Sequence, residues 1–326
     1  MKVIITRKIP QSGIAYLKKF GFSVEVRKSD VPPTIEELIA LSQKADGMIT
    51  LLTDPLNETF FKKCGKNLKI VANYAVGFDN ISAIHAKERK IAATNTPVLE
   101  MSQAVAEHTW GLILASARRV VESDTFTRGL HYKTWGPELL LGMQLKGKTL
   151  CIVGSGRIGS EVARIGAHGF GMKIIYVNPH KNPELEKNAH AKRLTLDRAL
   201  KIADVISIHT PLTKETRHLI SKKELELMKE TAILINTARG PIVDEKALLQ
   251  ALNKQKIAGA ALDVFECEPA LDCDVKDHLE LRKMPNVILT PHTASATIEA
   301  REAMSLSAAK NVVAVLQGKR PLNPIY

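Results

Sequence analysis

A glycine-rich hexapeptide is the feature of the sequence with the clearest chemical meaning. It reads GSGRIG at residues 154–159, follows the apolar segment TLCIV and precedes the helical segment SEVARIGAHGF. In such a strand–turn–helix unit, Gly154 allows the tight turn, Gly156 lets the backbone approach a pyrophosphate, and Gly159 lets helix and strand pack closely. Free N–H groups at the helix start then bind the phosphates. The hexapeptide predicts a dinucleotide site; the alternative is a glycine-rich turn without a ligand.

The end of the next predicted strand bears on which dinucleotide is bound. The segment IIYVNPHK places Asn178 there, followed by His180 and Lys181. Enzymes that use NAD commonly have an acidic residue at this point, which holds the ribose hydroxyls. An acid would repel the 2′-phosphate of NADP, and its absence removes that repulsion. We therefore expect NADP, with NAD as the alternative in which Asn178 holds the ribose and the two basic side chains face solvent.

Polar residues also follow the ends of several other predicted strands. Because ligands of an open parallel sheet bind outside the carboxyl ends of its strands, these residues should gather along one edge. They are Thr210, Pro211, Thr237, Ala238, Arg239, Asp263, Glu266, Glu268 and His292.

Three of these residues suit the reduction of a 2-keto acid. The guanidinium of Arg239 can bind a carboxylate in a bidentate manner. His292 can give a proton to the oxygen that becomes an alkoxide, and Glu268 can fix the tautomer of the ring and favour its protonated form. Taken singly, each also fits a plainer interpretation: a surface arginine, a histidine capping a strand end, and an exposed loop acid.

Short apolar runs alternate with helical patterns along the whole chain, which predicts an α/β fold with parallel sheets. One series of strands is expected at Val3–Thr6, Val24–Val26, Met48–Leu51, Ile70–Tyr74 and Ile91–Thr94. A second series is expected at Thr149–Val153, Ile174–Val177, Val205–His209, Ile233–Asn236, Ala260–Val264 and Val287–Leu289.

Helix signals lie between these strands. T-x-x-E at Thr34 and S-x-x-E at Ser221 are capping boxes, and Asp244 precedes the helical segment EKALLQAL. Residues 102–120 form a long, mostly apolar segment that predicts one buried helix at a domain or subunit boundary. Residues 129–147 contain glycines, a proline and Trp135, and indicate an arm or linker, whereas a helix is expected from about Thr297 to Leu316.

Composition excludes some classes of protein. No stretch approaches the roughly 20 apolar residues that a membrane span needs. The net charge of +12 fits either nucleic-acid binding or a lysine-rich surface that attracts anionic substrates. The lysines are spread along the chain, which favours the second interpretation. We expect a cytoplasmic protein without a membrane or nucleic-acid partner.

The four cysteines are scattered and form no C-x-x-C pair, which favours neither a disulfide framework nor a zinc site. Cys267 and Cys273 flank Glu268, but no pair of further ligands lies nearby at the right spacing. No metal is therefore expected.

Seven ordered segments together resemble the D-isomer-specific 2-hydroxyacid dehydrogenases over nearly the whole chain. They are NYAVGFDNI (73–81), AVAEHTWGLILA (104–115), GKTLCIVGSGRIG (147–159), HTPLTKETRHLI (209–220), INTARGPIVDEKAL (235–248), ALDVFECEP (261–269) and NVILTPHTAS (286–295). The resemblance implies two Rossmann-like or flavodoxin-like α/β domains with the active site in the cleft between them. The substrate-binding domain would comprise residues 1–100 and 293–326, and the dinucleotide-binding domain, residues 101–292, would be inserted.

The resemblance also implies roles for individual residues. Arg239, Glu268 and His292 fall on the catalytic positions of the family. The substrate would contact Leu52, Val76, Gly77, Arg239 and His292. The cofactor would contact Thr109, Gly154, Gly156, Arg157, Ile158, Gly159, Asn178, His180, Lys181, Thr210, Pro211, Thr237, Ala238, Asp263 and Ser295.

Within the family, NYAVGFDNI is most similar to glyoxylate and hydroxypyruvate reductases, which implies a small 2-keto acid and its 2-hydroxy acid as the reactants. Alternatives are D-lactate, larger 2-keto acids or phosphoglycerate as substrates. Family members are usually dimers joined through the cofactor domain, with the arm around Trp135 reaching the partner. Some relatives act instead as nucleotide-sensing transcriptional scaffolds.

Overall fold

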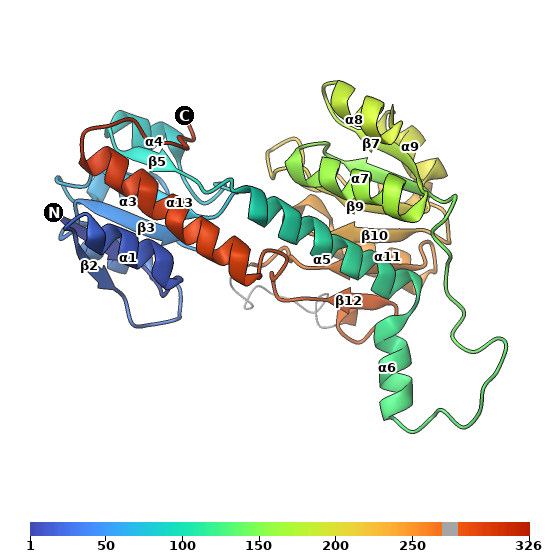
Figure 1. Cartoon of the computed structure of the whole chain (residues 1–326). Helices are drawn as coiled ribbons and strands as arrows, with labels where there is room; N and C mark the ends of the chain where they lie inside the picture. Colours follow the sequence, from blue (N-terminus) through green and yellow to red (C-terminus); the bar gives the residue numbers. More distant parts are fainter. Residues whose placement is uncertain (269–279) are drawn as a thin grey trace. The chain divides into compact units, whose positions relative to one another are not determined.

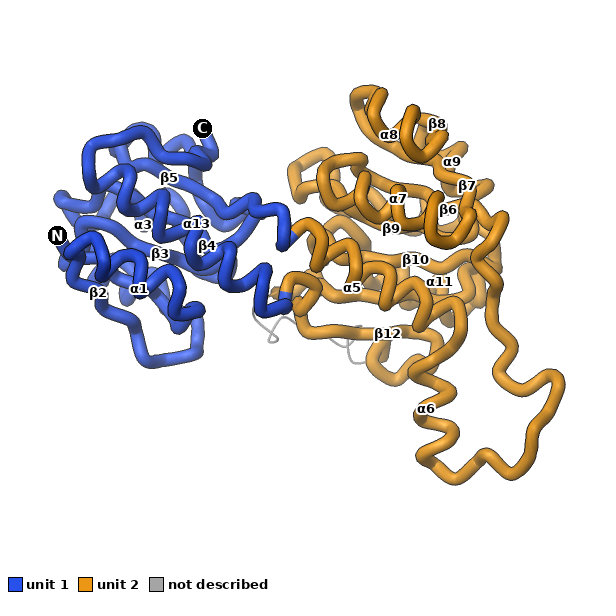
Figure 2. The backbone as a smooth tube through the Cα atoms, in the orientation of Figure 1, with its two compact units in different colours: residues 1–101, 296–326 blue, residues 102–295 orange. Residues whose placement is uncertain are grey.

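The computed structural model describes residues 1–268 and 280–326, and the chain divides into two compact units (Figure 2). Unit 1 contains residues 1–101 and 296–326, and unit 2 contains residues 102–295. Each unit is built around a parallel β-sheet with helices on both faces, as the alternation of apolar strands and helical segments predicts.

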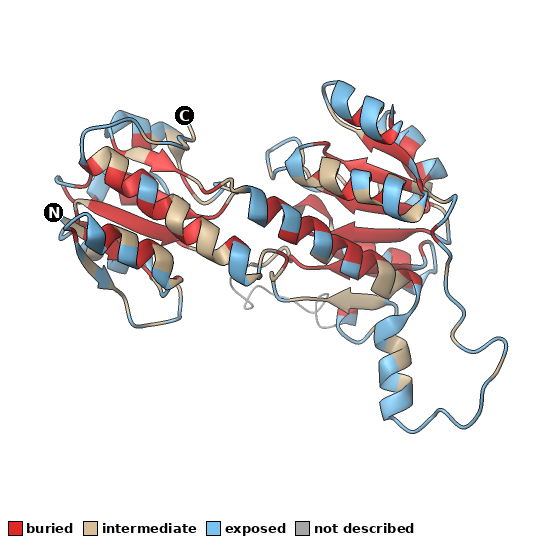
Figure 3. Ribbon diagram, in the orientation of Figure 1, coloured by how far each residue is buried: buried red, intermediate tan, exposed pale blue. Residues whose placement is uncertain are grey.

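The described part of unit 1 forms a five-stranded parallel sheet in the order β2-β1-β3-β4-β5. This is the strand order of flavodoxin-like folds. The strands are β1 (Lys2–Ile5), β2 (Ser23–Val26), β3 (Gly47–Leu51), β4 (Ile70–Tyr74) and β5 (Ala92–Thr94). Every residue of β4 is buried, because helices cover the sheet on both sides (Figure 3).

The helices of unit 1 lie in two layers (Figure 1). One layer shares a hydrophobic core with the sheet and consists of α2 (Ile35–Ser42), α3 (Glu58–Lys63) and α4 (Ala83–Glu88). The other consists of α1 (Gln11–Lys19) and α13 (Ile298–Leu316), so the C-terminal helix completes the N-terminal sheet. Thr34 and Glu37 form the predicted capping box of α2, and Thr297 caps α13.

The described part of unit 2 forms a seven-stranded parallel sheet in the order β12-β11-β10-β9-β6-β7-β8. The strands are β6 (Thr149–Val153), β7 (Lys173–Val177), β8 (Lys192–Arg193), β9 (Val205–Ile208), β10 (Ile233–Asn236), β11 (Gly259–Leu262) and β12 (Val287–Leu289). The strand order reverses between β6 and β9, which is the doubly wound topology that binds a ligand at the reversal.

Two hydrophobic clusters attach helices to the two faces of this sheet. One includes residues of α5 (Leu99–Ala117), α7 (Arg157–Phe170) and α8 (Pro183–Ala189). The other includes residues of α9 (Leu196–Ile202), α10 (Lys222–Leu227) and α11 (Glu245–Asn253). A short 3₁₀ turn, η1, spans Gly240–Ile242. Asp244 caps α11 as predicted, with its carboxylate accepting from the amide of Ala247 at 2.9 Å.

Two details of the predicted elements are wrong. The segment 102–120 is not one helix, because α5 ends at Ala117 and Arg119 has a left-handed backbone (φ 52°) before α6 (Val120–Arg128) begins. Strand β8 has only two residues, both exposed and charged, so it carries no hydrophobic pattern that the sequence could reveal.

Three further observations concern membrane spans, metal sites and the cysteines. In the parts of the chain that the structure describes, no helix is long and apolar enough to cross a membrane. Among the same residues, no group of His, Cys, Asp and Glu could hold a metal ion. Cys267 is disulfide-bonded, which the cysteine spacing did not predict, and Cys273 lies outside the described residues.

Candidate active site

The glycine-rich turn connects β6 to α7 in unit 2, and its three glycines have different surroundings. Gly154 has a positive φ of 98°, which favours glycine. A Cβ at Gly159 would lie 2.1 Å from the carbonyl oxygen of Gly154, so only glycine lets the helix pack this close to the strand. A Cβ at Gly156 would meet no atom within 4 Å. The space in front of Gly156 is therefore open, as the approach of a phosphate requires.

A cavity of about 660 Å³ opens beside this turn, at the carboxyl ends of the strands where the sheet order reverses. Among the predicted cofactor residues, Gly154, Asn178, Lys181 and Thr210 line it. The cavity is also lined by Arg193 and Arg198, which the sequence reasoning did not single out, and its lining residues include no acid. Its walls therefore favour an anionic ligand.

The side chain of Asn178 organises the loop after β7. Its Oδ1 accepts from the amide of Ser155 at 3.4 Å, and its Nδ2 donates to the carbonyl of His180 at 3.0 Å. Arg193 donates from Nε to the carbonyl of Asn178 at 2.9 Å. His180 and Lys181 are exposed. The Oγ of Ser155 is buried and has no hydrogen-bond partner among the described residues, so this hydroxyl can form a hydrogen bond with a ligand.

The other predicted residues of the turn region differ in exposure. Arg157 is exposed at the start of α7, whereas the side chain of Ile158 packs against the hydrophobic core of unit 2. Thr109 of α5 is fully buried, and its hydroxyl lies 3.0 Å from that of Thr237 after β10. The structure thus brings Thr109 and Thr237 together, although 128 positions separate them in the sequence.

Arg239 lies in a loop that a buried asparagine holds in shape. Asn236, the last residue of β10, accepts from the amide of Ala238 at 3.0 Å and donates to the carbonyl of Arg239 at 2.9 Å. Arg239 Nη1 also donates to the carbonyl of Ala238 at 2.8 Å. Asn236 is a supporting residue that sequence reasoning missed, although a polar residue ending the apolar run ILIN was a usable signal.

The predicted histidine and glutamate are in direct contact in unit 2. His292 Nδ1 lies 2.6 Å from Glu268 Oε2, and both side chains are about a quarter exposed, at 25% and 22%. The backbone of His292 is left-handed (φ 51°). Its amide donates to the carbonyl oxygens of Asp263 at 2.8 Å and Thr290 at 3.0 Å, which holds this conformation.

Asp263, at the end of β11, anchors the loop that carries His292. Its buried carboxylate accepts from the hydroxyl of Thr290 at 2.6 Å and from the amides of Thr293 at 2.8 Å and Ala294 at 2.9 Å. Burial alone would raise the pKa of Asp263, but these bonds and one with His108 lower it overall. Asp263 therefore stays ionised and supports the loop. The neighbouring Ser295 is half-buried.

The predicted substrate residues of unit 1 lie in two loops that amide side chains tie together. Asn73 donates to the carbonyl of Gly77 at 3.0 Å, and Asn95 donates to that of Val76 at 2.8 Å. Asn80 donates to the carbonyls of Leu51, at 3.1 Å, and Asp54, on either side of the half-buried Leu52. With the carbonyls engaged in this way, the loops keep a fixed shape. Sequence reasoning named the loops but not the asparagines.

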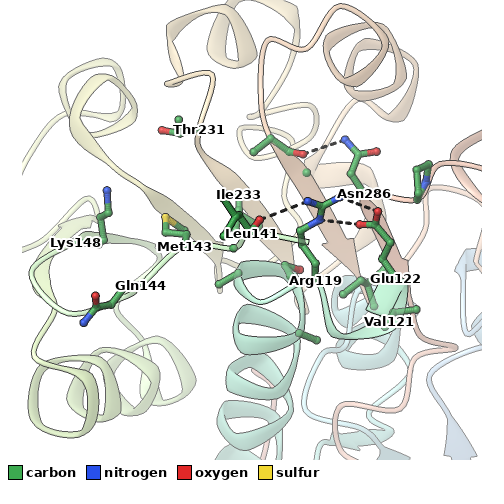
Figure 4. A pocket seen from close by; sticks show the side chains of 18 of the residues that line it. Arg119, Val121, Glu122, Leu141, Met143, Gln144, Lys148, Thr231, Ile233 and Asn286 are labelled. Atoms are coloured by element: carbon green, nitrogen blue, oxygen red, sulfur yellow. Dashed lines mark hydrogen bonds and ion pairs between the residues drawn. The ribbon is translucent and has the colours of Figure 1, made fainter. Parts of the chain in front are cut away.

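A larger cavity, of about 790 Å³, lies at the opposite edge of the unit 2 sheet, where its strands begin (Figure 4). Arg119 and Glu122 pair there, with Arg119 Nη2 and Glu122 Oε1 2.7 Å apart. None of the residues singled out for catalysis or cofactor binding lines this cavity. Part of the lining, including Leu141, Met143 and Gln144, comes from the arm at residues 129–147. The arm has exposed apolar side chains at Leu130, Tyr132, Trp135, Leu139 and Leu141.

Comparisons with known proteins agree on one family. The profile of the D-isomer specific 2-hydroxyacid dehydrogenase NAD binding domain matches residues 110–294. A glyoxylate reductase of Thermococcus litoralis is 47% identical over 326 residues, covering 99% of this chain and 96% of the relative.

Solved structures give the same result. The TT0316 protein from Thermus thermophilus has a TM-score of 0.91 and 40% identity, covering all of both chains. A glyoxylate reductase from Paecilomyes thermophila has a TM-score of 0.86 and 30% identity, covering 100% of this chain and 98% of that one.

Proposed function

The chain belongs to the D-isomer specific 2-hydroxyacid dehydrogenase family, and from this membership we propose that it reduces glyoxylate, or a 2-keto acid of similar size such as hydroxypyruvate, to the 2-hydroxy acid. The observation that carries the proposal is the 2.6 Å contact between His292 and Glu268, in the unit that also holds the dinucleotide turn. The full-length likeness to a glyoxylate reductase supports the substrate class.

The residues of unit 2 fit a nicotinamide dinucleotide, which would supply the hydride for the reaction. The open space before Gly156, the buried Ser155 hydroxyl and the N-terminus of α7 suit its pyrophosphate. We assign the other predicted cofactor residues to the same ligand. Lys181, Arg193 and Arg198 line the adjoining cavity without any acid, which favours the extra phosphate of NADP over NAD.

In this proposal, His292 transfers the proton to the substrate. Because Glu268 engages Nδ1, Nε2 is the ring nitrogen left to donate to the carbonyl oxygen of the substrate. The carboxylate of Glu268 stabilises the protonated ring and fixes its orientation. The carbonyl oxygen of the substrate gains this proton as the carbonyl carbon is reduced, and the carbonyl group becomes a hydroxyl group.

The substrate carboxylate needs cationic and N–H donors. Arg239 has a planar guanidinium and lies at the same edge of the unit 2 sheet as His292. The loops of unit 1 at Leu52, Val76 and Gly77 offer backbone groups whose shape the asparagine side chains maintain. We propose that both kinds of donor bind the substrate, with Arg239 also holding the keto group in place for reduction.

The absorbance of reduced nicotinamide at about 340 nm tests this function directly. Purified protein with glyoxylate and NADPH should show a steady loss of absorbance that depends on both reactants. Glycolate should accumulate in equal amount. Absence of turnover with glyoxylate, hydroxypyruvate and larger 2-keto acids, with either cofactor, would contradict the proposal.

The choice of cofactor has a separate test. Arg198→Gln should raise KM for NADPH by roughly tenfold while changing KM for NADH little, because the cavity loses a cation and the bond from Arg193 to the carbonyl of Asn178 is kept. Lys223→Gln, an exposed cation of α10 outside the cavity, is the matched control. Equal effects on both cofactors would argue against NADP as the preferred ligand.

We also infer a homodimer formed through unit 2. The arm at residues 129–147 carries exposed apolar side chains and its last part lines the cavity in Figure 4, so the two form one continuous surface of unit 2 for a second copy. Light scattering after gel filtration should give twice the chain mass of 35.8 kDa. Trp135→Ser with Leu139→Ser should shift the mass toward the monomer, and a monomeric wild type would refute the inference.

A further inference from the structure

We propose that Glu245 is a positioning residue for the proposed reduction: together with Glu266 and His218 it forms a clamp across three strand-end loops that holds Glu268 against His292. The inference rests on the proposed role of the His292–Glu268 pair. It assigns a function to a buried carboxyl group that takes no part in the mechanism above.

Glu245 and Glu266 are joined in both directions. The amide of Glu266 donates to Glu245 Oε1 at 2.7 Å, and the amide of Glu245 donates to Glu266 Oε2 at 3.3 Å. Glu245 is the first residue of α11, which is anchored by its cap, Asp244. The helix start therefore fixes the backbone of Glu266, two residues before Glu268.

His218 closes the clamp from the loop that follows β9. Its Nε2 lies 2.5 Å from Glu266 Oε1, and its amide donates to the carbonyl of Pro241 at 2.8 Å. Glu266 is thus held by His218 and by Glu245. Glu245 directly follows the loop, residues 237–244, that carries Arg239.

Close backbone packing makes the clamp stiff. A Cβ at Gly240 would lie 1.9 Å from the carbonyl carbon of Phe265, so the Arg239 loop and the Glu268 loop touch through their main chains. The amide of Glu268 donates back to the carbonyl of Phe265 at 3.3 Å. A change at Glu245 is therefore transmitted to Glu268 through one short segment.

The protonation state of Glu245 fits its place beside the carboxylates of Glu266 and Glu268. Its side chain is almost fully buried, with 2% exposed. Burial raises the pKa of Glu245 to about 8 despite the bond from the Glu266 amide, and the nearby carboxylates of Glu266 and Glu268 act in the same direction. Near neutral pH the protonated side chain holds the Glu266 amide without adding a third negative charge beside Glu268. A glutamine would have the same shape and charge.

The test combines turnover with a direct titration of the His292 ring. In Glu245→Ala, kcat for glyoxylate with NADPH should fall about tenfold, because the loop loses its support, while KM for glyoxylate changes less. Glu245→Gln should restore kcat at pH 7. The matched control is Glu224→Ala, which removes a carboxylate that accepts from Ser221 at the start of α10, away from the clamp; it should leave kcat unchanged.

The NMR titration midpoint of His292, identified as the histidine signal missing in His292→Ala, needs no turnover. Glu245→Ala should move this midpoint to lower pH, in the same direction as Glu268→Gln, because the anionic partner is held less firmly. Glu245→Gln should not move it. If Glu245→Ala does not fold, His218→Ala, which removes an exposed member of the clamp, should give a smaller shift in the same direction.

The two readouts separate the two proposals. A wild type without turnover, but with the expected shifts of His292, would refute the proposed function and retain the clamp. An unchanged His292 midpoint in both Glu245→Ala and His218→Ala would overturn the clamp, whatever happens to thermal stability. Failure of Glu245→Gln to restore kcat and the midpoint would overturn it as well.

Discussion

The strand-end loops of the two units are built from different chemistry. In unit 2 they carry ionisable side chains, with His292 and Glu268 2.6 Å apart and Arg239 in the loop after the neighbouring strand. In unit 1 the amide side chains of Asn73, Asn80 and Asn95 bind backbone carbonyls of the predicted substrate loops, and an ion pair of Asp54 with Arg7 also supports the loop after β3. Both sheets are parallel and covered on both faces, so the difference lies in the loops rather than in the fold.

This difference indicates that the two units have different roles in the proposed reaction. Unit 2 holds groups that can gain or lose charge, which hydride and proton transfer require. Unit 1 holds the main chain in a fixed shape, which suits recognition of an anion by backbone groups. Changes to the His292–Glu268 pair of unit 2 should therefore affect mainly turnover, and changes to the asparagines of unit 1 should affect mainly substrate binding.

The largest effect is expected from His292→Ala. Removal of the proton donor should lower kcat for glyoxylate reduction by about 10³-fold, because general acid catalysis contributes on this scale. KM for glyoxylate should change little, and the fold should be retained because the ring is partly exposed. Steady-state kinetics at about 340 nm measure both constants. Near-normal kcat would remove His292 from the mechanism.

The glycine turn should give the next largest effect, and its members should differ. Gly156→Ala should raise Kd for NADPH by roughly tenfold or more while leaving Tm unchanged, because its Cβ meets no protein atom but occupies the space for the pyrophosphate. Gly159→Ala should also lower stability by about 1–3 kcal/mol, because its Cβ would clash with Gly154. Fluorescence titration and thermal unfolding measure the two effects.

A smaller, binding-specific effect is expected in unit 1. Asn73→Ala should raise KM for glyoxylate about fivefold to tenfold and change kcat less than about threefold, because the Gly77 carbonyl loses its donor. Asn311→Ala is the control: this buried asparagine of the same unit binds the amides of Leu322 and Asn323 in the C-terminal tail. A loss of kcat alone in Asn73→Ala would break the proposed division between units.

The last prediction concerns stability rather than catalysis. The folded protein holds a proton on Glu245 up to a pH of about 8, whereas the unfolded chain releases it above 4.5. Wild-type stability should therefore fall as pH rises from 4.5 to 8, by at most about 1.4 kcal/mol per pH unit, and then level off. Glu245→Gln should lack this component in urea unfolding. Parallel pH profiles for the two proteins would contradict the raised pKa.

Much of the fold could be predicted because its signals are local. Buried strands such as Ile70–Tyr74 and Val205–Ile208 are short, mostly apolar runs, and Thr34 and Asp244 mark helix starts by their own chemistry. Strand β8 and the break at Arg119 could not be predicted. Strand β8 lacks an apolar pattern. The backbone of Arg119 is left-handed, which no local sequence rule indicates.

The residues of the candidate site could also be predicted only in part. Arg239, Glu268 and His292 could be named from residue type and from their place after predicted strands. Their supports could not, because contacts such as Thr109 with Thr237, Asp263 with Thr293, and Glu245 with Glu266 depend on which loops the topology brings together. Arg193 and Arg198 were missed for another reason: Arg193 lies in the two-residue strand β8, which has no hydrophobic signal, and Arg198 lies in the helix that follows it.

The pH dependence of kcat in the reducing direction reports the protonation of the group that completes the reaction. With NADPH and glyoxylate saturating, wild-type kcat should decline as pH rises, since the proton donor is lost. In Glu268→Gln the decline should begin at lower pH, because the protonated ring loses its anionic partner. Superimposable profiles, with reduction shown to limit the rate, would contradict the assignment of proton transfer to the His292–Glu268 pair.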